Sequence, residues 1–453
     1  MINLFEYQNS EHFPDQHYED LELFLDDIWN KREKSSYYSD DNDKREEVQR
    51  FIQFLHKSGD LKSNKYVGVI HFEGHTINLL PKIFYERNKE FDDASVKTIN
   101  MHILWWLSYC TKIKFPNYLS GLNSQNGDFF EILIYLFSKY TKELLHSALY
   151  QKYMEVENEL ANVRGRIDFN NYINNNLATA RHHLVSCVYD SFEMDNEFNQ
   201  CVKYVSRLLV STSKNPDSIR NLNEIIFLLD DVTDTAVSAE LCRRIGFNKM
   251  FNSFETVRDY CLLFLENSIS FNYKNDLKLF AFLLPMEYVF EDFLHGFINR
   301  EVDGVKSNRQ VSNRYLDNAE NFNLRLDLLL EVNAKKFIAD AKYKIIYSDE
   351  KDKKNGISQN DLYQMIAYAI RFNIPDVKLF YPATIQNPFS NSRGDIEVCD
   401  CLADGKLITI ETHRLNIIDE NILSNKNENI GFHERFESLT NQLKVYLNDI
   451  LFV

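Results

Sequence analysis

Apolar residues recur along the chain at two spacings, one typical of helices and one typical of strands. Residues 40–60 carry the i, i+3, i+4, i+7 spacing of an amphipathic helix at Val48, Phe51, Ile52 and Leu55. Gly59 stands where such a helix would end. Residues 65–84 instead predict two strands around a turn at Glu73 and Gly74.

The rest of the chain alternates helical and strand-like stretches. Residues 98–160 and 196–270 are helical in pattern, and a basic turn containing glycine separates them at 162–173. The last part predicts helices at 284–299, 358–372 and 433–450, with strands at 322–347 and near 377–381 and 405–412. We find no internal repeat and no long linker.

One strand-like run, residues 337–344, contains charged residues among apolar ones. Side chains alternate between the two faces of a strand, so Asp340 and Lys342 share a face with Ile338. The preceding residues predict a hairpin partner, with the two-residue turn at Asn333 and Ala334. In that register Asp327 lies directly opposite Asp340.

Length and charge limit the classes of function. A chain of 453 residues is long enough for two or three domains, and its 44% hydrophobic and 26% charged residues are ordinary for a globular protein. The formal charge of −16 argues against coating nucleic acid by bulk electrostatics, so any DNA contact must be local. The best local candidate is 335–354, with seven lysines and four acids, although such a run is often only a solvated face.

Cysteine usage and hydropathy indicate the compartment. The seven cysteines show no C-x-x-C pair or zinc-type spacing, so we expect reduced, mostly buried thiols in a cytoplasmic protein. The start lacks the pattern of a signal peptide, and no segment approaches the roughly 18 apolar residues of a membrane span. We therefore expect no membrane association.

The hairpin predicts a metal site. Opposed side chains have Cβ atoms about 5 Å apart, and two carboxylates at that distance repel unless a cation or proton lies between them. Mg²⁺ takes one or two carboxylates in sites that act on phosphates. Lys342, on the same face, could orient or help deprotonate the attacking water. The arrangement predicts metal-assisted hydrolysis of phosphodiesters.

Two predicted helices add residues to this set. Glu287 and Glu291 are four apart on one helical face, and either could add a carboxylate to the metal. Gln364 and Tyr368 are likewise four apart on the helix that follows the lysine-rich segment. A D-x-K triplet alone occurs by chance in many proteins, but the ordered set is far more specific.

This ordered set resembles the PD-(D/E)xK nuclease superfamily in its Q-x-x-x-Y branch. Several stretches between about 65 and 370 further resemble the McrC family, the nuclease subunit of McrBC-type modification-dependent restriction systems: VGVIHFEGHTINLLPKI, RGRIDF, CVYDSFEMDNEFNQ, MEYVFEDFL, LRLDLLL, IADAKYK and DLYQMIAYA. One departure is Leu326, which stands before Asp327 where the family often has proline. The change affects backbone stiffness and leaves the ligand unchanged.

The resemblance implies an α/β (α+β) protein with a restriction-endonuclease-like PD-(D/E)xK core. It implies a partner-binding, β-containing N-terminal domain at 1–160, a helical and DNA-contacting region at 161–275, and the endonuclease domain at 276–453. The implied catalytic residues are Asp327, Asp340, Lys342, Glu291, Gln364 and Tyr368, with Asp327, Asp340 and Glu291 as ligands of Mg²⁺, for which Mn²⁺ would substitute. The implied partners are an McrB-like AAA+ GTPase hexamer, which the N-terminal domain would stimulate, and double-stranded, modified DNA.

Three alternatives stay open at this stage. The chain has no G-x-x-x-x-G-K-[ST] loop, since Gly405 and Lys406 are followed by Leu407, so the motor must be a separate protein. The chain could instead be a non-cleaving regulatory subunit of that motor, or a solitary repair nuclease of the same fold. Arg164 and Arg166 of RGRIDF are equally compatible with a turn between domains and with contact to a DNA backbone.

Overall fold

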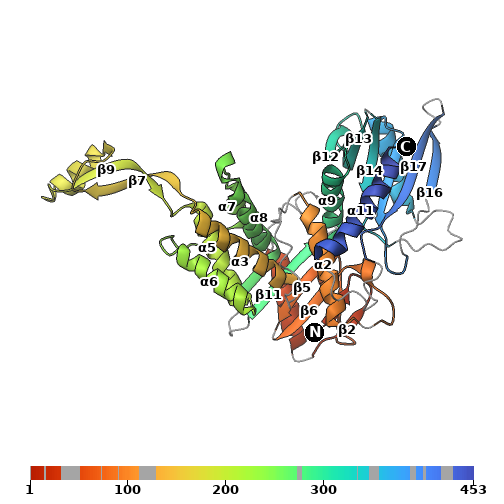
Figure 1. Ribbon diagram of the computed structural model, residues 1–453, viewed down its shortest axis with the longest axis horizontal. Coiled ribbons are helices and arrows are strands. Elements are labelled where there is room, and N and C mark those ends of the chain that lie inside the picture. Colours follow the sequence, from red (N-terminus) through yellow and green to blue (C-terminus); the bar gives the residue numbers. More distant parts are fainter. Residues whose placement is uncertain are drawn as a thin grey trace. The chain divides into compact units, whose positions relative to one another are not determined.

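A computed structural model describes the chain at residues 2–14, 17–31, 51–72, 74–89, 91–111, 129–272, 278–333, 335–345, 357–387, 394–400, 405–419 and 432–452 (Figure 1). It divides into two compact units, the first made of 1–132 with 266–453, and the second of 133–265. These limits differ from the boundaries at 160 and 275 that the sequence suggested for functional regions. The mixture of several sheets and helices confirms an α+β protein.

The N-terminal sheet of the first unit joins strands that are far apart in the sequence. Its order is β1 (Ile2–Phe5), β6 (His75–Leu80), β5 (Tyr66–Phe72), β11 (Lys278–Pro285) and β10 (Ser268–Asn272). The pairing of Phe72 with His75 confirms the predicted hairpin, and Gly74 supplies the positive φ of +78° that this turn needs. The long-range pairing of β5 with β11 makes this sheet depend on both ends of the chain.

A smaller sheet corrects the predicted first helix. Its order is β2 (Ser10–His12), β4 (Asp60–Ser63) and β3 (Ile52–Leu55). Ile52 and Phe54 are buried while Gln53 is exposed, so the period of two prevails over the helical spacing. The helix prediction is therefore wrong here, and Val48 lies outside the described residues.

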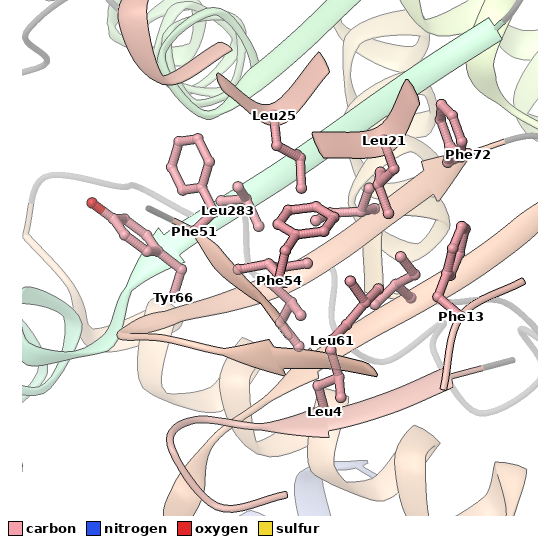
Figure 2. Packing of buried hydrophobic residues seen from close by; sticks show 14 of the residues in the cluster. Leu4, Phe13, Leu21, Leu25, Phe51, Phe54, Leu61, Tyr66, Phe72 and Leu283 are labelled. Atoms are coloured by element: carbon pink, nitrogen blue, oxygen red, sulfur yellow. The ribbon is translucent and has the colours of Figure 1, made fainter. Parts of the chain in front are cut away.

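Helix α1 (Tyr18–Lys31) covers this region. Leu21 and Leu25 pack with Phe54 and Leu61 in an apolar cluster that also includes Tyr66 (Figure 2). The 3-10 helix η3 (Lys82–Phe84), α2 (Asp93–Tyr109) and α3 (Phe129–Ser147) follow in the chain, and α3 crosses the boundary between the units. The helical pattern predicted from residue 98 is thus confirmed for α2 and α3.

The main sheet of the first unit has six strands in mixed orientation. Its order is β12 (Val305–Tyr315), β13 (Asn323–Val332), β14 (Lys335–Ala341), β15 (Asp376–Pro382), β17 (Lys406–Leu415) and β16 (Gly394–Asp400). β14, β15 and β17 are parallel, and the other pairs are antiparallel. The helices α9 (Met286–Glu301), α10 (Gln359–Phe372) and α11 (Phe432–Leu451) agree with the three predicted ones.

The second unit contains helices and one sheet. The helices are α5 (Glu197–Thr212), α6 (Pro216–Leu228), α7 (Ala239–Arg244) and α8 (Asn252–Asn267), with the short η6 (Lys249–Phe251). The sheet has the order β7 (Lys152–Leu160), β9 (Val185–Glu193) and β8 (Arg166–Ile167). Along the chain, β8 is followed by the short helices α4 (Phe169–Asn171) and η5 (Tyr172–Leu177). Its strands extend away from α5 and α6 (Figure 1).

The strand β7 corrects the helix expected to continue to residue 160. Nine residues of β7 pair antiparallel with β9, and this pairing outweighs the helical spacing. The basic turn after it contains Gly165 at φ +67°, where a Cβ would lie 2.4 Å from the Val188 carbonyl oxygen. The Arg164 guanidinium lies 4.2 Å from the centre of the Tyr189 ring, a cation–π contact within this sheet.

Two further observations concern cysteines and hydropathy. Among the described residues, Cys399 is an exposed thiol, and five thiols are buried, as the expectation of mostly buried thiols requires: Cys110, Cys187, Cys201, Cys242 and Cys261. None of the described helices is both long enough and apolar enough to cross a membrane.

Candidate active site

The hairpin of β13 and β14 has the register predicted from the sequence. Val332 pairs with Lys335 and Leu328 with Ala339, which places Asp327 and Asp340 as the next opposed residues. Asn333 adopts a left-handed conformation at φ +48° in the turn. The Ala341 backbone N–H donates to Asp327 Oδ2 at 3.3 Å, so the Asp327 carboxylate lies at the end of β14.

Asp340 is the most buried charged group of this hairpin. Its side chain is 0% exposed, and its Oδ2 lies 2.8 Å from Lys342 Nζ. Its other oxygen, Oδ1, has no hydrogen-bond partner among the described residues. A buried carboxylate oxygen without a donor is costly unless another positive group is supplied there.

A chain of hydrogen bonds connects Lys342 to helix α10. Lys342 Nζ donates to Gln364 Oε1 at 3.3 Å, and Gln364 Nε2 donates to the Tyr368 hydroxyl at 2.9 Å. The Tyr368 hydroxyl in turn donates to the Arg325 carbonyl on β13 at 2.8 Å. The structure therefore brings together five of the six predicted catalytic residues in one polar network: Asp327, Asp340, Lys342, Gln364 and Tyr368.

Local sequence explains why α10 lies there. Ser358 caps the helix by accepting from the Asp361 backbone N–H, and Asn373 ends it in the left-handed conformation at φ +56°. Lys344 Nζ lies 2.9 Å from both carboxylate oxygens of Asp361, which ties the segment after β14 to the first turn of the helix. Met365 and Ala369 pack in the core beneath.

The close carboxylates perturb one another. Burial, followed by the charges of Asp340 and Glu291, raises the pKa of Asp327 well above its ordinary value. Burial also raises the pKa of Glu291, against the opposing effect of Arg309 and with a further contribution from Asp340. Burial alone would lower the pKa of Lys342, but the charges of Asp340 and Asp327 raise it.

These couplings distinguish the two glutamates of α9. Glu291 is half-buried, and its charge acts on Asp327, whereas Glu287 is exposed and acts on Glu6 and Tyr343. Its burial and its coupling to Asp327 favour Glu291 over Glu287 as the member of the site on this helix.

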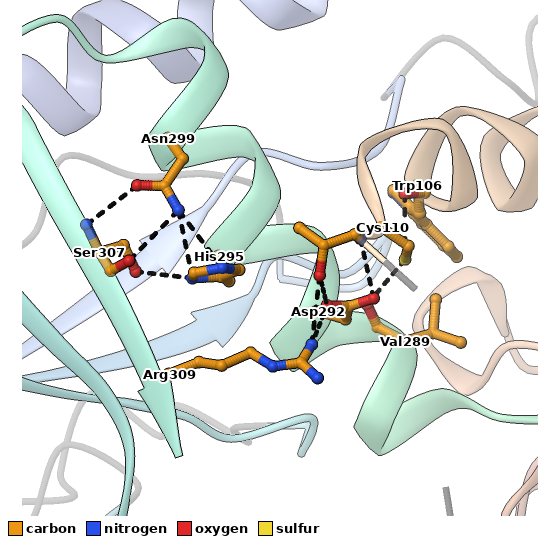
Figure 3. A network of polar contacts seen from close by, with 9 residues as sticks. Trp106, Cys110, Val289, Asp292, His295, Asn299, Ser307 and Arg309 are labelled. Carbon is orange, nitrogen blue, oxygen red and sulfur yellow. Dashed lines mark hydrogen bonds and ion pairs between the residues drawn. The ribbon is translucent and has the colours of Figure 1, made fainter. Parts of the chain in front are cut away.

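The sequence reasoning missed an ion pair next to Glu291, formed by Asp292 and Arg309. Asp292 is buried on α9, accepts from the Thr111 backbone N–H at 3.0 Å and hydroxyl at 2.7 Å, and is paired with Arg309 of β12 (Figure 3). Next to this network, His295 Nδ1 lies 3.0 Å from the Ser307 hydroxyl. Asp292 follows Glu291 directly in EDF, but no spacing pattern linked it to an arginine 17 residues later.

The two aspartates fit a divalent cation. Mg²⁺ needs one or two carboxylates and keeps waters as its other ligands, and Asp327 and Asp340 offer two, one with an unpartnered buried oxygen. Across the described parts of the chain, no three His, Cys, Asp or Glu side chains lie close enough together to hold a metal. The fit therefore rests on the aspartate pair.

Comparison with known proteins identifies the family. A family model described as the McrBC 5-methylcytosine restriction system component matches residues 61–382, well over half of the chain. The chain belongs to the McrBC family. The resemblance to McrC in the sequence is thereby confirmed.

A solved structure shows the same fold. A chain in the refined half-complex from the tetradecameric assembly of Thermococcus gammatolerans McrB AAA+ hexamers with bound McrC matches with a TM-score of 0.67 at 17% identity. The match covers 99% of this chain and 100% of the other. A chain in the cryo-EM structure of the Thermococcus gammatolerans McrBC complex matches less well, with a TM-score of 0.49 at 18% identity over 66% of this chain and 87% of the other. Among curated proteins, none matches significantly.

Proposed function

We propose that this McrBC-family chain is the DNA endonuclease subunit of a GTP-dependent restriction complex, with a PD-(D/E)xK core and Mg²⁺ as cofactor. The observation that carries the proposal is the network that joins the opposed Asp327 and Asp340 to Lys342, Gln364 and Tyr368. An inactive relative has no need to keep a buried, mutually repelling carboxylate pair beside a lysine.

Each residue of the proposed active site has a distinct role. Asp327 and Asp340 would hold Mg²⁺, or Mn²⁺ in its place, with Glu291 near enough to act on their charge. When bound, the cation would polarise the phosphodiester and help to generate the attacking nucleophile. Lys342 is fixed between Asp340 and Gln364, so its ammonium is oriented to stabilise negative charge on the phosphate.

Helix α10 would keep the lysine in place. Gln364 accepts from Lys342 and donates to Tyr368, and Tyr368 is anchored on the β13 backbone beside Asp327. The two strands and the helix are thus linked by side-chain hydrogen bonds that an apolar replacement could not make. A loss of either residue should misplace the ammonium without removing any carboxylate.

We further propose an McrB-like AAA+ GTPase hexamer as the partner, and double-stranded, modified DNA as the substrate. The solved structure with the same fold holds McrC bound to such hexamers. The β7–β9–β8 sheet carries exposed apolar side chains suited to docking, including Tyr153 at 70% and Phe192 at 49% exposure, with ring centres 4.9 Å apart. In this view the partner-binding surface includes residues of the second unit and extends beyond residue 160.

DNA cleavage by the reconstituted complex tests the function. With partner, GTP and Mg²⁺, the wild type should cut DNA, and Lys342→Ala should lower the rate by about 100-fold or more. Lys406→Ala is the matched control, because the Lys406 ammonium donates to Asn373 Oδ1 at 2.7 Å and has no part in the network of Lys342, so cleavage should be unchanged. Stimulation of GTP hydrolysis without any cleavage by the wild type would favour a regulatory subunit, and cleavage independent of the partner would favour a solitary nuclease.

Partner binding tests the docking surface. Tyr153→Ser with Phe192→Ser should weaken binding to the AAA+ hexamer in a pull-down or sedimentation assay. Phe227→Ser, which removes an apolar side chain of α6 that is 76% exposed, is the control. Equal binding by the double variant and the wild type would place the docking surface elsewhere.

A further inference from the structure

Another buried carboxylate, Glu6, is hydrogen-bonded to the segment that follows β14. Glu6 follows β1 and is 0% exposed. Its Oε2 accepts from the Lys82 backbone N–H at 3.1 Å and from the Tyr343 hydroxyl at 3.1 Å. Its Oε1 has no hydrogen-bond partner within the described part of the chain.

Tyr343 connects this carboxylate to the proposed active site. It directly follows Lys342 in the chain, so an anchored Tyr343 side chain restrains the backbone that carries Lys342. Its buried ring lies 4.4 Å from Lys82 Nζ and 5.9 Å from the Phe290 ring of α9, the helix that carries Glu291. The Lys342 backbone N–H donates to the Phe380 carbonyl at 2.9 Å, which fixes the same segment on the sheet.

A stability role alone does not explain a carboxylate at this point. Burying a carboxylate costs more than burying an apolar side chain of the same size, and one oxygen of Glu6 gains no hydrogen bond among the described residues in return. The charged and titratable groups that act on it are Lys82 from η3, Tyr343 after β14, and Glu287 from α9. Tyr7, on the turn after β1, also feels its charge.

We propose that Glu6 is a positioning residue for DNA cleavage: by holding the Tyr343 hydroxyl, it fixes the backbone that presents Lys342 to the phosphate. The inference rests on the nuclease function proposed above and adds to it the residue that directly follows the first strand of the chain. Glu6 touches neither the substrate nor the reacting atoms. It acts through Tyr343.

The ionisation of Glu6 gives this role a measurable signature. Burial raises the pKa of Glu6 to about 7, with Lys82 and the two hydrogen bonds opposing the effect. Above that pH the carboxylate is charged, and a hydrogen bond to a charged acceptor is stronger than one to a neutral acid. The hydrogen bond from the Tyr343 hydroxyl to Glu6 should therefore become stronger as the pH rises through the neutral range.

Conservative variants test the proposal in the reconstituted complex. Glu6→Gln keeps the acceptor but cannot ionise, so its kcat should equal that of the wild type near pH 6 and be about fivefold lower at pH 8. Tyr343→Phe keeps the ring but loses the hydroxyl, so its kcat should be low at both pH values. The KM for DNA should not change in either variant, and a melting curve for each verifies that it is folded.

A matched tyrosine controls for the loss of a buried hydrogen bond. The Tyr109 hydroxyl donates to Glu301 Oε1 at 3.0 Å in the same unit, so Tyr109→Phe removes an equivalent contact away from Lys342. It should cut DNA like the wild type at both pH values. If Tyr343→Phe does not fold, the pH profile of Glu6→Gln decides the question.

The outcomes separate the two proposals. A wild type that never cuts DNA overturns the nuclease function itself. A wild type that cuts, a Lys342→Ala variant that does not, and a Glu6→Gln variant that follows the wild type at every pH overturn only the role of Glu6.

Discussion

At the scale of single residues, the site follows from local sequence wherever its members are neighbours in a hairpin or a helix. Asp327 and Asp340 are opposed because the Asn333 turn fixes the register, and Gln364 and Tyr368 meet because they are one helical turn apart. Glu6 and Tyr343 are 337 residues apart, and no spacing rule connects them. Such contacts depend on the tertiary fold.

The aspartate pair makes a metal-linked stability prediction. Without metal, repulsion between Asp327 and Asp340 should cost about 0.2 to 1 kcal/mol, so Asp327→Asn should raise the metal-free melting temperature slightly. Mg²⁺ should stabilise the wild type by about 2.7 kcal/mol at 100 times its dissociation constant, and the variant should lose most of that gain. Thermal melts with EDTA and with Mg²⁺ measure both effects.

The sign of the pH dependence provides a control for this prediction. The pKa of Asp327 is raised in the folded protein, so folding favours its protonated form. The free energy of unfolding without metal therefore falls as the pH rises above the ordinary pKa of an aspartate. Asp327→Asn should flatten that fall. A variant that is less stable than the wild type without metal, yet responds fully to Mg²⁺, would mean that the two aspartates do not share an ion.

At the scale of elements, the pattern of apolar residues predicted the type of most long segments and failed where strand pairing decided the outcome. The helices α9, α10 and α11 and the strands β13 and β14 are confirmed. β3 and β7 were expected to be helical, because Phe51 to Leu55 and Tyr153 to Val156 also fit a helical spacing, and their pairing with β4 and β9 was not visible locally.

The start of α10 is an element whose cap supports the site. Ser358→Ala removes the acceptor for the Asp361 N–H and should lower the free energy of unfolding by about 1 kcal/mol. Cleavage should also decrease, because Gln364 and Tyr368 depend on this helix. Ser211→Ala, at a serine whose hydroxyl donates to the Leu208 carbonyl within α5 and caps no helix N-terminus, is the control, and chemical denaturation of both variants makes the comparison. Equal loss in the two variants would contradict a capping role.

At the scale of the whole molecule, the first unit is assembled from both ends of the chain. In the first unit, strand β5 pairs with β11 near residue 280, and in the second unit β7 pairs with β9 near residue 189. The sequence suggested that residues 1–160 form a partner-binding domain, but it could not show that this segment shares a sheet with residues 278–285. Contacts between distant strands leave no local pattern.

A fragment of residues 1–160 should therefore fold poorly. It lacks the partners of β5 and β7, and so exposes two strand edges that the full chain covers. We expect low cooperativity in a thermal melt and association during size-exclusion chromatography. A fragment that is monomeric and melts cooperatively would show that β11 and β9 are dispensable, and would allow the partner-binding role to be tested on the fragment alone.

The most direct test of the nuclease assignment is the DNA cleavage rate of Asp340→Asn in the reconstituted complex, measured together with GTP turnover by the partner. Asp303→Asn, at a fully exposed position of the same unit, is the matched control. We predict that Asp340→Asn abolishes cleavage and leaves GTP turnover unchanged, while the control cuts like the wild type. Normal cleavage by Asp340→Asn would contradict the proposed active site.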